Sequence, residues 1–131
     1  TAKPRTVFTL DLTTPSPKVD MDPTEVELVV TNLVKNASQA ASAQTDEAHV
    51  DVAVTADSDY AILTVKDNGP EISDEALNAI GNVGLTTKTN GLGLGVAIIR
   101  SLLEVHGASL TYRKHQPEGL TAVVKWPLSR D

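Results

Sequence analysis

Residues 22–43 read DPTEVELVVTNLVKNASQAASA, and this stretch decides the fold class. Its opening Asp-Pro pair is a typical helix start, because Asp caps the first turn and proline fits the first helical position. At about 100° per residue, one polar stripe of this helix carries Asn32, Asn36 and Gln39. A separate apolar stripe should face a sheet, and it comprises Val26, Val30, Leu33, Ala37 and Ala41.

The rest of the chain divides into short strand-like and helical segments around this helix. Apolar and β-branched residues predict strands over 6–12, 49–54, 60–67, 108–114 and 120–126, and periodicity predicts further helices over about 74–80 and 94–106. This order of elements predicts an α+β fold. We expect a two-layer α/β sandwich, in which three helices cover one face of a mixed, mostly antiparallel sheet.

Length and composition fit a single domain, residues 1–131, with an aliphatic core. The formal net charge of −6 argues against nucleic-acid binding, which needs clustered Lys and Arg. The chain has no Cys, which excludes disulfides, thiolate catalysis and Cys-ligated zinc, and no apolar run approaches the ~18 residues of a membrane helix. Because Thr1 is preceded by neither an initiator Met nor a signal-peptide core, we expect the chain to be excised from a longer protein.

The segment KTNGLGLG at residues 88–95 places three glycines before the last predicted helix. The free N–H groups at a helix start bind phosphate, glycine lets the backbone approach it closely, and Lys88 adds a positive charge. The segment is not a Walker A loop, since it lacks the final Gly-Lys-Ser/Thr. It is not a Rossmann fingerprint either, since Val96 replaces the third glycine. Alone, it is compatible with a nucleotide phosphate site or with a flexible loop.

Two further motifs carry compatible chemistry. The oxygen of Asn36 can ligate Mg²⁺, which needs only one protein ligand when it is shared with substrate phosphates. Asp67, at a predicted strand end before Asn-Gly-Pro, can accept a hydrogen bond from an exocyclic amine such as that of adenine. Each motif alone has an ordinary alternative, a solvated helix face for the asparagines and a plain turn for Asp67.

In this order and spacing, the motifs resemble those of the sensor histidine kinases, over about residues 6–128. The resemblance implies the Bergerat ATP-binding fold, which is shared with gyrase, Hsp90 and MutL-type ATPases. The matching segments are residues 32–37 for the N box, 67–70 for the G1 box, 91–95 for the G2 box, 85–88 for the end of the F box, and the shorter signatures at 106–107 and 119–121.

The resemblance also implies roles for the matching residues. Asn36 is the expected Mg²⁺ ligand, Asn32 faces the phosphates, and Asp67 reads the adenine amino group. The ATP lid and its hinge span residues 88–95, and Asn32, Asn36 and Lys88 are the expected catalytic residues. The nucleotide-binding residues that the resemblance implies are Asn32, Asn36, Gln39, Asp67, Gly69, Thr87, Lys88, Gly91, Leu92, Gly93, Leu94, Gly95 and Thr121.

The chain departs from the family pattern in two places. Glu71 occupies the second glycine position of the G1 box and adds a side chain and a charge near the expected pocket mouth. Val83 and Leu85 stand where aromatic residues are common in the F box. We therefore expect an altered nucleotide affinity and a short, loosely anchored lid.

The residue at position 32 favours a kinase over an ATPase. ATP-hydrolysing members of the superfamily resemble this chain but carry a Glu general base there, and the Asn32 amide cannot take a proton from water. A histidine kinase needs no such base, because imidazole is already a nucleophile at neutral pH. His49, His106 and His115 lack the acidic helical context of a phosphoacceptor, so we interpret them as structural or surface residues.

The expected function is binding of Mg-ATP and transfer of its γ-phosphoryl group to a histidine on a separate dimerisation domain. The isolated domain would be cytoplasmic and monomeric, and would contact neither nucleic acid nor membrane. Its parent would be a homodimer, membrane-anchored or not, that acts on a response regulator. Two alternatives remain open: a nucleotide-binding module of the same fold without phosphotransfer, and a Ser-directed anti-sigma-factor kinase.

Overall fold

A computed structural model of the chain describes residues 5–12, 16–79, 92–115 and 119–130. Within these residues, every predicted strand and helix is present, with bounds shifted by at most two residues. In chain order the elements are β1 (Arg5–Leu12), α1 (Pro23–Gln44), β2 (Glu47–Ala56), β3 (Tyr60–Asp67), α2 (Asp74–Ala79), α3 (Leu92–Val105), β4 (Ser109–Lys114) and β5 (Leu120–Pro127).

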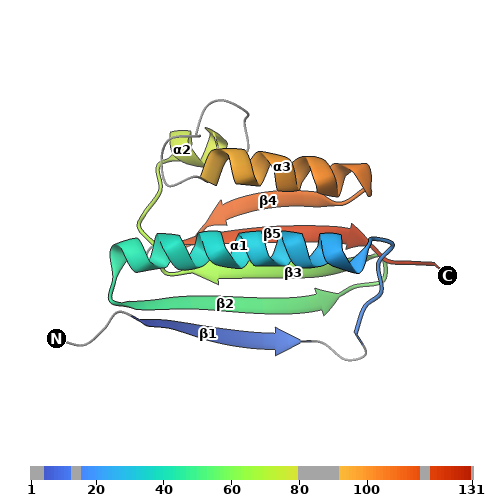
Figure 1. Cartoon of the computed structure of the whole chain (residues 1–131), viewed down its shortest axis with the longest axis horizontal. Coiled ribbons are helices and arrows are strands. Elements are labelled where there is room, and N and C mark those ends of the chain that lie inside the picture. Colours follow the sequence, from blue (N-terminus) through green and yellow to red (C-terminus); the bar gives the residue numbers. More distant parts are fainter. Residues whose placement is uncertain (1–4, 13–15, 80–91, 116–118, 131) are drawn as a thin grey trace.

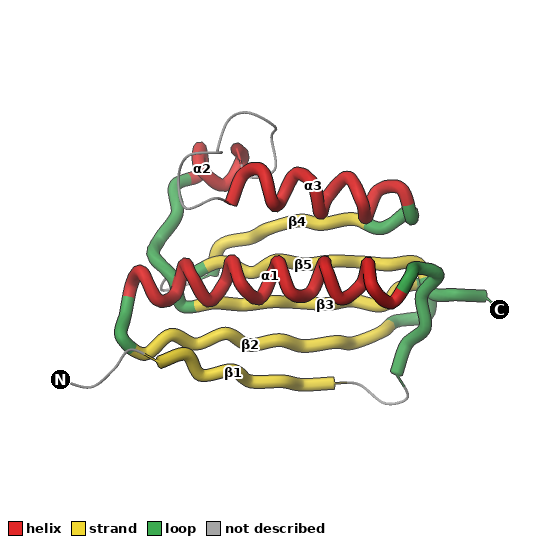
Figure 2. Tube along the Cα trace, viewed as in Figure 1, coloured by secondary structure: helices red, strands yellow, loops and turns green. Residues whose placement is uncertain are grey.

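The strands form one sheet in the order β1-β2-β3-β5-β4, in which β1 and β2 are parallel and every other pairing is antiparallel. Helices α1 and α3 lie side by side across one face of this sheet (Figure 1). The short helix α2 starts at the end of β4, where Asp74 forms a 2.7 Å ion pair with Lys114. Figure 2 shows the helices and the sheet as two layers, which confirms the predicted sandwich.

Helix α1 supplies the middle of the core. Its start is as predicted, because the Asp22 carboxylate accepts a 2.8 Å hydrogen bond from the Thr24 amide and Pro23 follows the cap. Val26 and Val30, which the sequence placed on the buried stripe, are only partly buried. Val30 still packs against the core, but its neighbour Val29 is the fully buried residue there, because consecutive apolar residues give periodicity no way to choose between them. The buried line runs through Val29, Leu33, Ala37 and Ala41.

Alternation along the central strands determines which side chains face the helices. Because successive side chains in a strand point to opposite faces, Asp67 is the last β3 side chain on the helix side. It is a carboxylate at the end of an otherwise apolar row. The buried residues on this side are Ala61, Leu63, Val65 and Asp67 from β3, and Ala122, Val124 and Trp126 from β5.

Helix α3 covers the β4 side of the sheet. The Arg100 guanidinium donates to the Leu110 carbonyl through Nε (3.3 Å) and Nη2 (3.2 Å), which fastens α3 to β4. The helix ends as predicted at Gly107, which has a φ of +73° and donates its amide to the Glu104 carbonyl at 3.0 Å.

Strand β1 lies at the outer edge of the sheet, and its apolar side chains are poorly covered. Phe8, Leu10 and Leu12 are each more than half exposed. The helix layer therefore covers the middle of the sheet and the β4 edge rather than the whole face. Among the described residues, no helix is both long enough and apolar enough to cross a bilayer.

Candidate functional site

A cavity lies between α1 and the helix-facing side of the sheet, where β3 ends and β5 begins. It is apolar except for an amide, a carboxylate and a phenol. Apolar walls with a few placed polar groups are typical of a site for a small organic ligand. The lining residues are Leu33, Asn36, Ala37 and Ala40 from α1, Val65 and Asp67 from β3, Tyr112 from β4, and Leu120 and Ala122 from β5.

Asp67 is the buried acid of this cavity, with 7% of its surface exposed. Its Oδ1 accepts a 2.8 Å hydrogen bond from the Gly69 amide, and the nearby Leu120 amide also favours the charged form. Burial raises the pKa of Asp67 above its ordinary value of 3.8, while the two amides and the charge of His115 oppose the rise. An ionised carboxylate has about four lone-pair sites, so capacity remains for a donor on a ligand.

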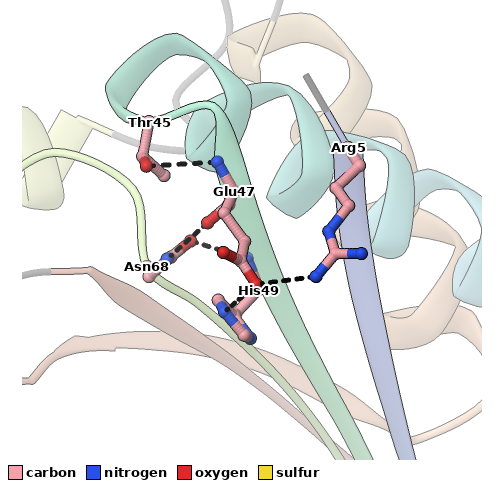
Figure 3. A network of polar contacts seen from close by, with 5 residues as sticks. All are labelled: Arg5, Thr45, Glu47, His49 and Asn68. Carbon is pink, nitrogen blue, oxygen red and sulfur yellow. Dashed lines mark hydrogen bonds and ion pairs between the residues drawn. The ribbon is translucent and has the colours of Figure 1, made fainter. Parts of the chain in front are cut away.

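Asn68 fixes the backbone that follows Asp67. Its Oδ1 accepts a hydrogen bond from the His49 amide (2.8 Å), and its Nδ2 donates to the Glu47 carbonyl (3.3 Å) (Figure 3). Glu47 in turn pairs with Arg5 of β1 at 3.1 Å. The sequence motif contained Asn68 but did not reveal this positioning role, because the partners belong to a strand nineteen or more positions earlier.

Gly119 allows β5 to begin directly against Asp67. Its φ is +113°, and a Cβ at this position would collide with the Asp67 backbone oxygen and lie 2.6 Å from His115 Cε1. The positive φ and the lack of space therefore both exclude a side chain at position 119. The close approach brings the Leu120 amide to the Asp67 carboxylate, which explains why a glycine is needed in the 119–121 segment.

The two asparagines of α1 extend the site toward the start of α3. A Cβ on Gly95 would lie 3.8 Å from Asn32 Oδ1, so Asn32 neighbours the first turns of α3. The Asn32 Nδ2 donates to the Leu28 carbonyl at 3.0 Å. Asn36, one turn further along α1, lines the cavity. A helix start carries unpaired N–H groups that favour anions. Along α1, the apolar cavity with Asn36 is therefore followed by Asn32 and the anion-favouring start of α3.

Some residues that the sequence assigned to the site do not line the cavity. Thr121 lies between Leu120 and Ala122, and strand alternation directs its side chain to the opposite face of the sheet. Gln39 is exposed on α1, and Glu71 is also exposed. Leu92, Gly93 and Leu94 form the first turn of α3. The predictions for Val83, Leu85, Thr87, Lys88 and Gly91 fall outside the described residues.

The side chains of this site suit a magnesium ion that is shared with the phosphates of a ligand better than a metal ion that protein side chains alone enclose. In the part of the chain that the structure describes, no group of three or more His, Cys, Asp or Glu side chains could hold a metal. Asn36 lines the cavity, and its side-chain amide contains a hard oxygen. Mg²⁺ accepts such an oxygen and completes its shell with water and ligand phosphates.

Residues 21–130 match the family described as histidine kinase-, DNA gyrase B- and HSP90-like ATPase. The chain therefore belongs to this ATPase family. It is 32% identical over 109 residues to sporulation kinase A of Bacillus subtilis, a match that covers 83% of this chain and 18% of that protein. It is 31% identical over 115 residues to the sensor histidine kinase ZraS of Escherichia coli, covering 86% and 24% of the two proteins.

Among solved structures, the catalytic domain of the histidine kinase ThkA matches with a TM-score of 0.81 and 26% identity, over 93% of this chain and 78% of that domain. Within the family, the chain is thus an ATP-binding catalytic domain of the histidine-kinase type. It spans less than a quarter of the length of the two curated relatives.

Gly69 and Gly95 provide a matched test of the packing around the cavity. A Cβ at Gly69 would lie 2.9 Å from Asp67 Oδ1 and 3.1 Å from the backbone of Ala40, whereas at Gly95 the nearest atom would be 3.8 Å away. Gly69→Ala should lower the free energy of unfolding by about 1–3 kcal/mol through overpacking. Gly95→Ala should raise it by up to about 1 kcal/mol, because alanine favours a helix. Urea unfolding measures both, and the opposite ranking would contradict this packing.

Proposed function

We propose that the chain binds Mg-ATP in the cavity between α1 and the sheet and transfers the γ-phosphoryl group to a histidine on a separate domain. The adenine occupies the cavity and donates its amino group to Asp67. Asn36 holds the Mg²⁺ together with water and phosphates, and the phosphates extend past Asn32 toward the start of α3. The observation that carries the proposal is a buried acid and an amide oxygen in one apolar cavity.

The surroundings of the phosphates favour phosphotransfer over hydrolysis. The Asn32 amide donates to a backbone carbonyl and cannot remove a proton from water. Among the described lining residues, Asp67 is the single carboxylate, and two amides engage it at the base end of the site. An imidazole acceptor needs no general base, so orientation of ATP and neutralisation of the developing charge are sufficient.

The acceptor histidine belongs to another domain of the parent protein. His49 lies in β2, His106 follows the end of α3 and His115 follows the end of β4, so none of the three lies on a helix as the predicted acceptor would. The partners that fit this arrangement are a His-bearing dimerisation domain and, beyond it, a response regulator in the cytoplasm. A structure of ThkA in complex with the response regulator protein TrrA contains a domain of this fold.

The position of Glu71 gives no support to the alternative function, a nucleotide-binding module of the same fold without phosphotransfer. Its side chain is exposed and does not line the cavity, so it leaves the base site open.

Asp67→Asn, combined with a phosphotransfer assay, tests this function. The variant should weaken ADP binding at least about tenfold in calorimetry, because the amide presents a donor where the carboxylate accepts. The wild-type chain should also label a histidine on the parent's dimerisation domain from γ-labelled ATP, and Asp67→Asn should lose this labelling. Asp51→Asn, which removes an exposed acid on β2, is the matched control and should keep both activities.

Two outcomes would overturn parts of the proposal. Absence of ADP binding by the wild-type chain at millimolar nucleotide, or unchanged affinity in Asp67→Asn, would refute the assigned site. Binding without any labelled histidine on the dimerisation domain would refute phosphotransfer and favour the nucleotide-binding module.

A further inference from the structure

Tyr112 lines the cavity, yet no sequence motif includes it and the proposed function does not use it. It lies on β4 opposite Ala122 of β5, on the helix-facing side of the sheet. The chain has four aromatic residues. Phe8 lies on the outer strand, and Tyr60 and Trp126 lie at the other end of β3 and β5 from Asp67. Tyr112 is thus the aromatic side chain at this site.

The surroundings of Tyr112 differ from those of a residue that fills a core. Small side chains border the same space, namely Ala37, Ala40 and Ala122, and a cavity of about 20 Å³ remains. Protein interiors are close-packed, and an empty apolar space costs stability. Tyr112 therefore presents a large ring to the same small cavity that Asp67 and Asn36 line.

The cavity is too small for a base, so part of its wall must move when a base enters. A volume of about 20 Å³ holds about one water molecule, much less than a purine. The alanines and Val65 are short side chains attached to fixed backbone, and Leu33 is almost fully buried, whereas Asn36, Leu120 and Tyr112 are longer and only partly buried. Tyr112 has a large ring and two rotatable side-chain bonds, so it can turn and then lie along a bound ring.

The electrostatic surroundings place the phenol of Tyr112 near the base-reading acid. Burial raises the pKa of Tyr112, Arg100 opposes the rise, and the negative charge of Asp67 adds to it. The phenol is therefore neutral at physiological pH, and its ring is an uncharged aromatic surface within electrostatic range of the Asp67 carboxylate.

We propose that Tyr112 is a base-contact residue, whose ring packs against the adenine that Asp67 holds. The proposal rests on the proposed function, because it presumes a base in this cavity. Stacking of a nucleobase on an aromatic side chain contributes substantially to affinity and does not depend on backbone hydrogen bonds. Tyr112 thereby adds an aromatic wall from β4 to a site whose other described walls are aliphatic.

Calorimetry with ADP on two Tyr112 variants tests the contact. Tyr112→Leu should weaken ADP binding about tenfold, whereas Tyr112→Phe, which keeps the ring, should stay within about twofold of wild type. Tyr60→Leu removes the other tyrosine, which is exposed at the far end of β3, and should bind as wild type. Unchanged or tighter ADP binding by Tyr112→Leu would overturn the proposal, since a ring that only plugs the cavity would give that result.

A nuclear Overhauser measurement on the wild-type complex tests the same contact without any substitution. Cross-peaks between adenine protons and the ring protons of Tyr112, with none to Tyr60, are expected. A bound adenine without cross-peaks to Tyr112 would overturn the proposal even if Tyr112→Leu failed to fold. Failure of the wild type to bind ADP would instead refute the proposed function. Loss of binding in Asp67→Asn but not in Tyr112→Leu would refute the Tyr112 contact alone.

Discussion

A carboxylate buried at the end of a central strand stays ionised only if hydrogen-bond donors surround it. For Asp67 the hydrogen-bond donor is the Gly69 amide, and the nearby Leu120 amide also favours the ionised form; each of these amides constrains the chain around it. The turn after β3 must pass so close to α1 that a side chain at Gly69 would be too near its neighbours. β5 must begin so close to β3 that only glycine fits at position 119. Asn68 then holds the turn against the start of β2.

The same constraint connects the fold to the chemistry. Because the sheet and α1 converge around Asp67, the helix carries small residues there, and the space that they leave becomes the cavity. The polar residues of α1 continue from this point, with Asn36 at the cavity and Asn32 near Gly95 of α3. The proposed function places base recognition, metal binding and phosphate binding in order along the axis of this helix. No carboxylate is needed beside the phosphates in this arrangement, because an imidazole acceptor requires no general base.

Local signals in the sequence predicted the strands and helices. Asp67, Gly69 and Asn36 came from motifs, and each lies in or against the cavity. The apolar lining could not be predicted, because it depends on how β3, β5 and β4 pair across long stretches of chain. Thr121 illustrates the limit: the resemblance assigned it to the nucleotide, but the alternation of β5 turns its side chain to the face of the sheet opposite the cavity. At the start of the α1 stripe, several adjacent apolar residues compete for one position.

The most direct test of the central claim is a crystal structure of the chain with Mg²⁺ and a non-hydrolysable ATP analogue. The account predicts the adenine amino nitrogen at about 2.7–3.2 Å from an Asp67 carboxylate oxygen. It also predicts Mg²⁺ on the Asn36 oxygen and phosphates between Asn32 and the start of α3. A nucleotide bound elsewhere on the chain, with Asp67 still contacted only by the Gly69 and Leu120 amides, would contradict it.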